Sequence, residues 1–407
     1  MVIAYIFRGT DELPMPAKNT RDRAEGSAPR PKRSGAPAEL GSRRLQRMGS
    51  VTVGVVLPRS WIGERGLAVG SAIQLKALPD GALLLRAPEA SELRDTCTIP
   101  VATGTSPEHL FRQLIAAYLA GASEFVLVEP GGITAETRSI ARTFGRRTVQ
   151  PEVVSEEGEV IVLRDVTAGP DLALPLLVRR MYQLVYELQK TAGEFLEPEV
   201  HRNPAALAAR DDEVDRQAWL VERTLVLRLD PERVVDREPS LPRDPVSPLL
   251  LARSLERIAD HAVVLGENAA RLADCPIPDA VRSALQAYHR QALEYLRCAF
   301  EAAENPEVQR SNELIDTGEA LLAAHTTLTE SFLVRGAAPE LTPLASACLG
   351  LVLQSIDRTA AYAQDIAQVG LDRAISARIE RASTTALLAG AAPPGALAGS
   401  PVAEAAR

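Results

Sequence analysis

Several features that mark common protein classes are scarce in this 407-residue sequence. It has four cysteines, far apart and without CxxC spacing, so neither a disulfide framework nor a zinc knuckle is indicated, and a reducing, cytoplasmic location fits. No run of about 18 uncharged apolar residues predicts a membrane span, and the first residues make a poor signal peptide because no cationic segment precedes their apolar run. Aromatic residues are 4% of the chain, which favours helix packing over a β-sandwich.

Motifs of common enzyme classes are also missing. The sequence has no GxSxG elbow, no GxxxxGK[ST] phosphate loop and no HExxH motif, and its five histidines are scattered. We therefore expect that the chain is not an enzyme, and a metal-dependent hydrolase is the alternative that we rank last. His261 is interpreted as a satisfied surface or core histidine, and Trp61 and Trp219 as packing anchors.

Charge is unevenly distributed along the chain. Residues 1–88 hold 14 Lys and Arg against 7 Asp and Glu, whereas the remainder is acidic and brings the net charge to −8. A basic end on an acidic body predicts that the front contacts a polyanion and that the rest contacts cations or proteins. A basic disordered tail on a solvated helical protein is the alternative explanation.

The N-terminal part divides into a tail and a small β module. Residues 1–42 are rich in Pro, Gly, Ala and charge, which predicts a disordered tail, with an over-long gene start as the alternative. Residues 43–90 predict the order β-β-α-β-β, with turns at Gly49-Ser50 and Pro79-Asp80-Gly81. This module holds too little core for a stable monomer, so a strand-sharing homodimer is expected.

The rest of the chain changes from mixed to helical. Residues 91–168 predict the order β-α-β-α-β-β, which suits a small ferredoxin-like α+β domain. Two helical domains, 169–275 and 276–385, follow, and 386–407 predict a second disordered tail. The expected helices are 171–196, 204–229, 245–272, 279–304, 306–335 and 341–382.

The helical part repeats at an offset of 101 residues. The matched polar pairs are Ser254 and Ser355, Arg257 and Arg358, and Asp215 and Asp316. Helix periodicity alone aligns apolar positions but does not explain the matched polar ones. The fold is therefore expected to be mainly α, with two tandem three-helix bundles preceded by a small swapped-hairpin β domain and the α+β domain.

Two pairs of acidic residues stand one helical turn apart, Asp211 with Asp215 and Glu256 with Asp260. Carboxylates at this spacing repel each other unless a positive charge lies between them, and two adjacent helices could supply four oxygen ligands to a hard cation. The alternative is an exposed charged face, salt-bridged by neighbouring arginines, and spacing alone favours that alternative.

The motif RDDEVD, followed about 40 residues later by LERIADHA, resembles the paired acidic signature of PhoU phosphate regulators. That family consists of two three-helix bundles that bind metal ions through these motifs, and the resemblance covers roughly residues 171–382. It implies a divalent or trivalent metal ion held by Asp211, Asp215, Glu256 and Asp260. Asn312 and Ala361 stand at two of the acidic positions of the second bundle, so a metal ion is expected in the first.

The segment RRLQRMGSVTVGVVLPRSWI resembles the SpoVT/AbrB-like domain that precedes the helical pair in archaeal-type PhoU regulators. Such domains form interlocked dimers whose basic face binds DNA, which implies a DNA-binding regulator of phosphate uptake. The alternative is an adaptor that docks on a phosphate transporter or a sensor kinase without contacting DNA. The basic positions that match the DNA-binding face are Arg43, Arg44, Arg47 and Arg59.

Overall fold

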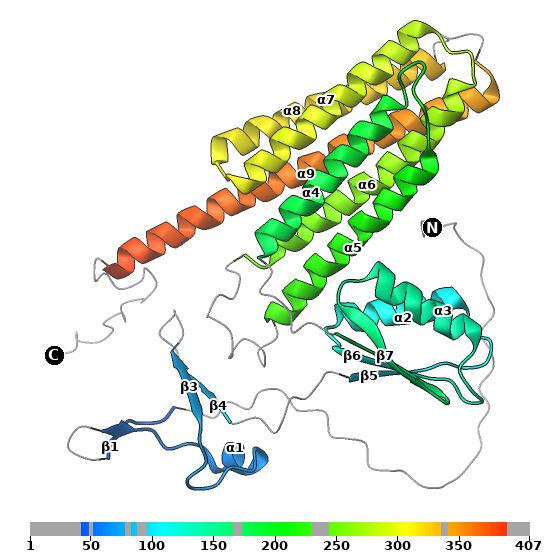
Figure 1. The fold of residues 1–407 in the computed structure, drawn as a ribbon. Helices are drawn as coiled ribbons and strands as arrows, with labels where there is room; N and C mark the ends of the chain where they lie inside the picture. The colour runs from blue at the N-terminus through cyan, green and yellow to red at the C-terminus, as the bar shows by residue number, and fades with distance from the viewer. Residues whose placement is uncertain are drawn as a thin grey trace, which may run out of the picture. The chain divides into compact units, whose positions relative to one another are not determined.

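The computed structural model describes a mainly helical protein in two compact units, residues 1–92 and 93–407 (Figure 1). The described residues are 42–48, 52–77, 83–87, 96–165, 173–229, 244–334 and 341–388. Within these ranges no helix combines the length and the apolar character needed to cross a membrane. Both predicted turns of the β module lie outside the described residues. So do the predicted tails, except for Ser42 and for residues 386–388, and these last three residues belong to a helix.

The first unit follows the predicted order of strands and helix. Its elements are β1 (Gln46–Arg47), β2 (Val53–Gly54), α1 (Arg59–Glu64), β3 (Gln74–Ala77) and β4 (Leu83–Arg86). The strands form two antiparallel pairs, β1 with β2 and β3 with β4. Pro58 directly precedes α1, where its missing N–H breaks no helical hydrogen bond, and Gly66 follows the helix with a φ of 61°.

The second unit begins with a four-stranded sheet and two helices, which we call the α+β domain. Its elements are β5 (Thr96–Pro100), α2 (Pro107–Leu119), β6 (Glu124–Val128), α3 (Ala135–Arg147), β7 (Pro151–Glu157) and β8 (Val160–Asp165). Ser106 and Thr134 cap the two helices, since their side chains accept hydrogen bonds from the backbone N–H groups of His109 and Thr137. The predicted order of strands and helices is confirmed.

The sheet of this domain differs from the ferredoxin-like prediction. Its strand order is β5-β6-β8-β7, with β5 parallel to β6 and the other pairs antiparallel. A ferredoxin-like fold splits its β-α-β units, so that another strand lies between the two parallel ones. Here β5 and β6 are direct neighbours, and the hairpin β7–β8 pairs through β8 with the other edge of β6.

Long helices make up the remainder of the described residues. They are α4 (Leu174–Glu194), α5 (Pro204–Leu229), α6 (Val246–Ala273), α7 (Asp279–Glu304), α8 (Val308–Thr329) and α9 (Pro343–Leu388). The predicted bounds of α5 and α7 are confirmed to the residue. Both ends of α4 and α6 and the first residues of α8 and α9 differ from prediction by one to three residues. The larger differences are that a short π-helix, η1 (Glu330–Val334), follows α8 and that α9 continues beyond residue 382.

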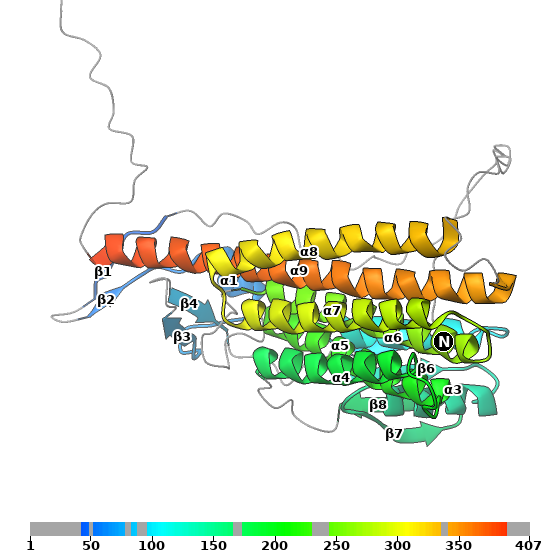
Figure 2. The same ribbon diagram turned by 90° about the horizontal axis from the view of Figure 1, so that it is seen from above.

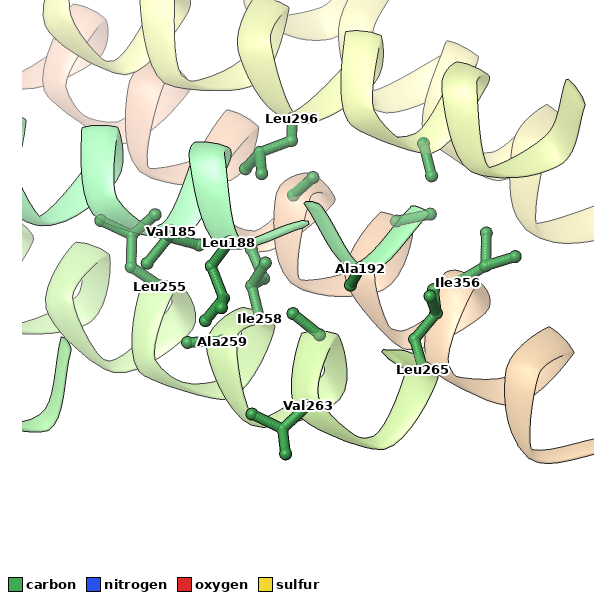
Figure 3. Close-up of a cluster of buried hydrophobic side chains, with 14 of the residues drawn as sticks. Val185, Leu188, Ala192, Leu255, Ile258, Ala259, Val263, Leu265, Leu296 and Ile356 are labelled. Atoms are coloured by element: carbon green, nitrogen blue, oxygen red, sulfur yellow. The ribbon is translucent and has the colours of Figure 1, made fainter. Parts of the chain in front are cut away.

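The helices form two three-helix bundles, α4–α5–α6 and α7–α8–α9, with α6 lying against α9 (Figures 1 and 2). Both bundles contribute to one continuous hydrophobic core. Leu188, Ile258 and Ile356 are fully buried in it and come from α4, α6 and α9 (Figure 3). The predicted boundary at residue 275 therefore separates two sequence repeats, and the two bundles share one hydrophobic core.

A buried polar network also joins the bundles. Gln189 of α4 donates from Nε2 to the carbonyl of Ile258 and to Oγ1 of Thr359, both at 2.8 Å. Its Oε1 lies 3.4 Å from Nε2 of His289 on α7. Burial lowers the pKa of His289 to about 4, so this side chain is neutral at physiological pH. The network therefore ties four helices together without burying a charge.

Candidate cation site

The four carboxylates predicted to bind a metal ion lie on two helices that pack against each other. Asp211 and Asp215 are on α5, and Glu256 and Asp260 are on α6. All four are half-buried, because the adjacent stripe of each helix, which includes the fully buried Val214 on α5, enters the core. We call these four side chains the carboxylate cluster.

Burial is the main reason why the pKa of every carboxyl group in the cluster is raised. The pKa rises to about 7 for Asp211 and Glu256 and to about 6 for Asp215, and that of Asp260 is also raised. Repulsion adds to the effect, since Asp215 acts on Asp211 and Asp260 acts on Glu256. The four carboxyl groups are therefore close enough to affect each other's ionisation. When all of them are ionised, their combined negative charge attracts a cation.

Arg147, the last residue of α3, reaches this cluster from the α+β domain. Its Nη2 lies 3.3 Å from Oδ2 of Asp215, and it also forms an ion pair with the adjacent Asp212. The guanidinium carbon lies 5.7 Å from the ring centroids of both Phe111 and Trp219. This guanidinium lowers the pKa of Asp215 and opposes the effect of burial.

Two further side chains of α5, Arg216 and Arg223, also contact the α+β domain. Arg216 donates from Nη2 to the carbonyl of Arg146 at 2.6 Å. Two turns further along α5, the buried Arg223 pairs with Asp165 at the end of β8. Residues 215 to 223 of α5 therefore form a docking strip for the α+β domain, and one end of this strip coincides with the carboxylate cluster.

The arginines that the alternative hypothesis assigned to a salt-bridged face neutralise the cluster only in part. Nε of Arg257 lies 3.4 Å from Glu256, but Arg253 pairs instead with Glu222 outside the cluster. Neither Asp211 nor Asp260 has an ion-pair partner among the described residues. A purely salt-bridged face therefore does not account for these two carboxylates.

The donor set suits a hard cation, since all four groups are carboxylates. In the described part of the chain, however, no three His, Cys, Asp or Glu side chains are gathered closely enough to hold one metal ion. The contacts above divide the cluster, because Asp215 pairs with Arg147 and Glu256 pairs with Arg257. An ion shared by α5 and α6 would need these side chains to turn toward a common point.

The second bundle does not repeat the cluster. Asn312 is exposed and donates to the carbonyl of Val308 in its own helix. Asp316 is exposed, whereas Asp357 lies 3.8 Å from Nδ1 of His325. The second bundle thus keeps two of the four carboxylates, because Asn312 and Ala361 stand at the other two positions.

His261 lies next to the cluster in the sequence, and the prediction that its ring nitrogens have hydrogen-bond partners is wrong for Nδ1. Its Nδ1 is buried and has no hydrogen-bond partner among the described residues, and its ring lies 6.0 Å from that of Tyr362. Burial lowers the pKa of His261 to about 4. The side chain is therefore a neutral imidazole between the two bundles.

The arginines predicted to contact DNA lie in the first unit. Arg47 belongs to β1 and Arg59 begins α1, and the side chains of Arg43, Arg44, Arg47 and Arg59 are all exposed. Among the side chains of this unit whose burial the structure describes, no hydrophobic one is buried. Its exposed large hydrophobic residues are Leu45, Met48, Val53, Val55, Val56, Val69, Leu75 and Leu83.

Sequence analysis did not single out Arg147 and Arg223. The available signal for Arg147 was a pair of basic residues in the last turn of α3, where Arg146 and Arg147 also complement the helix dipole. That local explanation is sufficient by itself, so the pattern does not reveal a partner 65 residues further along the chain.

A comparison with protein families identifies a PhoU domain at residues 178–269. The matched segment begins within α4, ends in the last turns of α6 and contains all four carboxylates of the cluster. No curated protein and no solved structure matches the chain.

Proposed function

We propose that this protein, which carries a PhoU domain at residues 178–269, regulates phosphate uptake in the cytoplasm and acts by binding rather than by catalysis. The observation that carries the proposal is the position of that domain, since it encloses the half-buried carboxylate cluster. Two activities make up the proposed function, cation binding in the first bundle and DNA binding by the first unit.

The first bundle binds one divalent or trivalent metal ion through Asp211, Asp215, Glu256 and Asp260. Their raised pKa values support this, because a bound cation would offset both the burial of the carboxylates and their mutual repulsion. The replacement of two acidic positions in the second bundle, by Asn312 and Ala361, supports a stoichiometry of one ion per chain.

Elemental analysis and calorimetric titration with metal salts test this activity. Wild-type protein should hold about one ion per chain, and Asp211→Ala and Glu256→Ala should lose it. Asp316→Ala is the matched control, since Asp316 is exposed on α8 and should leave binding unchanged. Equal metal content in all four proteins would contradict the assignment.

The first unit binds DNA as a homodimer. Four exposed arginines, the basic charge of residues 1–88 and the exposed hydrophobic side chains of the unit support this proposal. Binding to a DNA fragment should weaken steeply as salt rises. Each substitution of Arg43, Arg44, Arg47 or Arg59 by Ala should reduce the salt slope by about two, since it removes one phosphate contact from each protomer. Absence of binding at low salt would exclude this activity.

An adaptor that docks on a phosphate transporter or a signalling protein is the second candidate. The family match favours it, because that match covers the helical bundle and not the first unit. Removing residues 1–90 separates the two candidates, since residues 93–407 form a compact unit of their own. Control of phosphate uptake should survive the deletion for an adaptor and be lost for a DNA-binding regulator.

A further inference from the structure

We propose that the groove between α7 and α8 is a docking site for a partner protein, which binds there through an amphipathic helix that carries large apolar side chains flanked by arginine or lysine. The proposed site is independent of the cation site and of DNA binding, so it goes beyond the function proposed above. The two sequence repeats carry the evidence, because the equivalent surface of the first repeat already holds a domain.

An apolar groove of about 670 Å³ runs along the surface of the second bundle between α7 and α8. It extends over about three helical turns, from Ala287 to Cys298 on α7. Its wall on α8 consists of Leu314, Thr317, Ala320, Leu321 and Ala324. All five of these side chains are half-buried or exposed, so the groove presents apolar surface of a length that suits an added helix.

The repeat offset of 101 residues places this wall on the docking strip of α5. Three residues of that strip contact the α+β domain, and their equivalents all line the groove. The equivalent pairs are Arg216 and Thr317, Trp219 and Ala320, and Arg223 and Ala324. In the described part of the chain α8 packs against α7, α9 and η1, whereas α5 also packs against α2 and α3. The surface that is an occupied interface in the first bundle is therefore open in the second.

The size of the side chains at these positions indicates what the partner supplies. In the first bundle Trp219 packs against the core of the α+β domain, and Arg223 is buried against the same domain. In the second bundle Ala320 and Ala324 leave a hollow at the positions of these two projecting side chains. A partner therefore has to insert its own large apolar side chains, which are the usual anchors of a buried interface.

Two acidic residues beside the groove are equivalent to carboxylates that the α+β domain neutralises. Arg147 of that domain forms ion pairs with both Asp212 and Asp215. The residues 101 positions later are Glu313 and Asp316, which are exposed. Neither of them has an ion-pair partner among the described residues. The second bundle thus keeps the negative charge of the docking surface, and a basic side chain of a partner complements it.

The wall on α7 offers no comparable acidic surface. Glu294 is already paired with Arg297, and the exposed Arg290 adds a positive charge. A basic residue of the partner is therefore favoured on the α8 side of the groove and disfavoured on the α7 side. This difference fixes the chemistry of the bound helix, which has an apolar row with basic residues along the edge that faces α8.

Two synthetic peptides serve as probes of the groove. Both form helices of about 18 residues with the same row of leucines, and they differ only in the flanking residues, which are arginines in one and glutamates in the other. By fluorescence anisotropy the full chain should bind the arginine peptide at least about tenfold more tightly than the glutamate peptide. Binding should also protect the thiol of Cys298, which lines the groove, from iodoacetamide, and should leave that of Cys97 on β5 unprotected.

Substitutions on α8 locate the binding surface. Ala320→Trp fills the hollow with the side chain found in the first repeat, so it should abolish binding of the arginine peptide. Glu313→Lys combined with Asp316→Lys should weaken that binding about tenfold and remove the preference for arginine over glutamate. Ala323→Trp is the matched control, because Ala323 is exposed on α8 outside the groove, and it should bind as wild type does. Since all these residues are exposed, each variant should unfold at the wild-type temperature.

Three results would overturn the proposal. Equal binding of the arginine peptide by wild type and by Ala320→Trp would show that the groove is not the site. Equal affinity for the two peptides, or binding of neither, would refute a basic amphipathic helix as the occupant. A lower molar mass of Ala320→Trp than of wild type in light scattering would show that a second copy of this chain covers the groove instead.

Discussion

Arg223 and Asp165 form a buried ion pair that joins α5 to the end of β8. Nη2 lies 2.5 Å from Oδ2, and the two side chains are 1% and 14% exposed. Arg223 also donates to the carbonyls of Tyr118 and Ala122 and lies 4.4 Å from the Tyr118 ring. The guanidinium is thus desolvated and depends on these partners to remain buried.

Replacing Arg223 by Met should be strongly destabilising. It leaves Asp165 and two carbonyl groups without their donor, and breaking a buried pair in this way costs about 3–5 kcal/mol. Urea unfolding of the full chain measures the loss. The control is Arg179→Met, since Arg179 pairs with Glu304 but is 57% exposed, and this variant should keep nearly the wild-type stability. Similar losses in both variants would contradict the structural role assigned to Arg223.

The stability of the metal-free protein should fall as pH rises from about 4 to about 7. In the unfolded chain the Asp211 carboxyl ionises near its ordinary pKa of 3.8, whereas burial raises its pKa in the folded protein to about 7. Between these values the folded state binds more protons, so its advantage is complete below the lower pKa and is lost as pH rises through the upper one.

Asp211→Asn removes the part of this pH dependence that comes from Asp211 and so checks its origin. At pH 8, with a chelator present, the variant should be more stable than wild type by about 1 kcal/mol, after allowance for solvent screening of a partly exposed group. At pH 4 the two proteins should be equally stable. Thermal unfolding followed by circular dichroism gives both comparisons. A variant that is less stable than wild type at pH 8 would show that the ionised Asp211 carboxylate does not destabilise the folded protein.

Gly193 of α4 should not tolerate a methyl group. A Cβ atom at this position would lie 2.1 Å from Cε1 of His289, whose ring is buried in the network with Gln189. Overpacking of this kind typically costs about 1–3 kcal/mol, so Gly193→Ala should lower the midpoint of thermal unfolding. Gly63→Ala is the comparison, because no atom lies within 4 Å of its added Cβ and α1 should gain slightly in helix propensity.

A charge among the exposed hydrophobic side chains of the first unit should disrupt its association. Val53 is 58% exposed in β2, and Leu83 is 55% exposed in β4. A strand-sharing dimer would bury such residues, so Val53→Asp in the full chain should shift the molar mass measured by light scattering from dimer to monomer. Ser60→Asp, at an exposed position of α1, is the control. A wild-type protein that is monomeric at micromolar concentration would contradict the prediction.

Helical periodicity carried most of the fold prediction. The bounds of α5 and α7 were predictable because Pro204 and Asp279 begin long amphipathic stretches whose spacing is unbroken to the end of each helix. The duplication was predictable for a related reason, since polar positions recur together with the apolar ones at one offset. Trp219 was also correctly interpreted as a packing anchor, because it packs against the core of the α+β domain.

The remaining features depend on contacts between distant segments. Arg147 meets Asp215 across 68 residues, and no local pattern distinguishes this pair from the many other arginines and carboxylates of the chain. The sheet was misassigned because the order of strands along the chain does not determine their order in space. The π-helix at residues 330–334 likewise lacks a sequence signal that separates it from the α-helix before it.

The shared core beneath α6 and α9 constrains what the duplicated halves can do alone. Ile258 of one repeat and Ile356 of the other are each completely shielded from water. A fragment that contains only one repeat would expose these hydrophobic surfaces to solvent and is expected to aggregate. The helical region is therefore expected to unfold in a single cooperative transition, so that a destabilising substitution in either repeat also destabilises the other repeat.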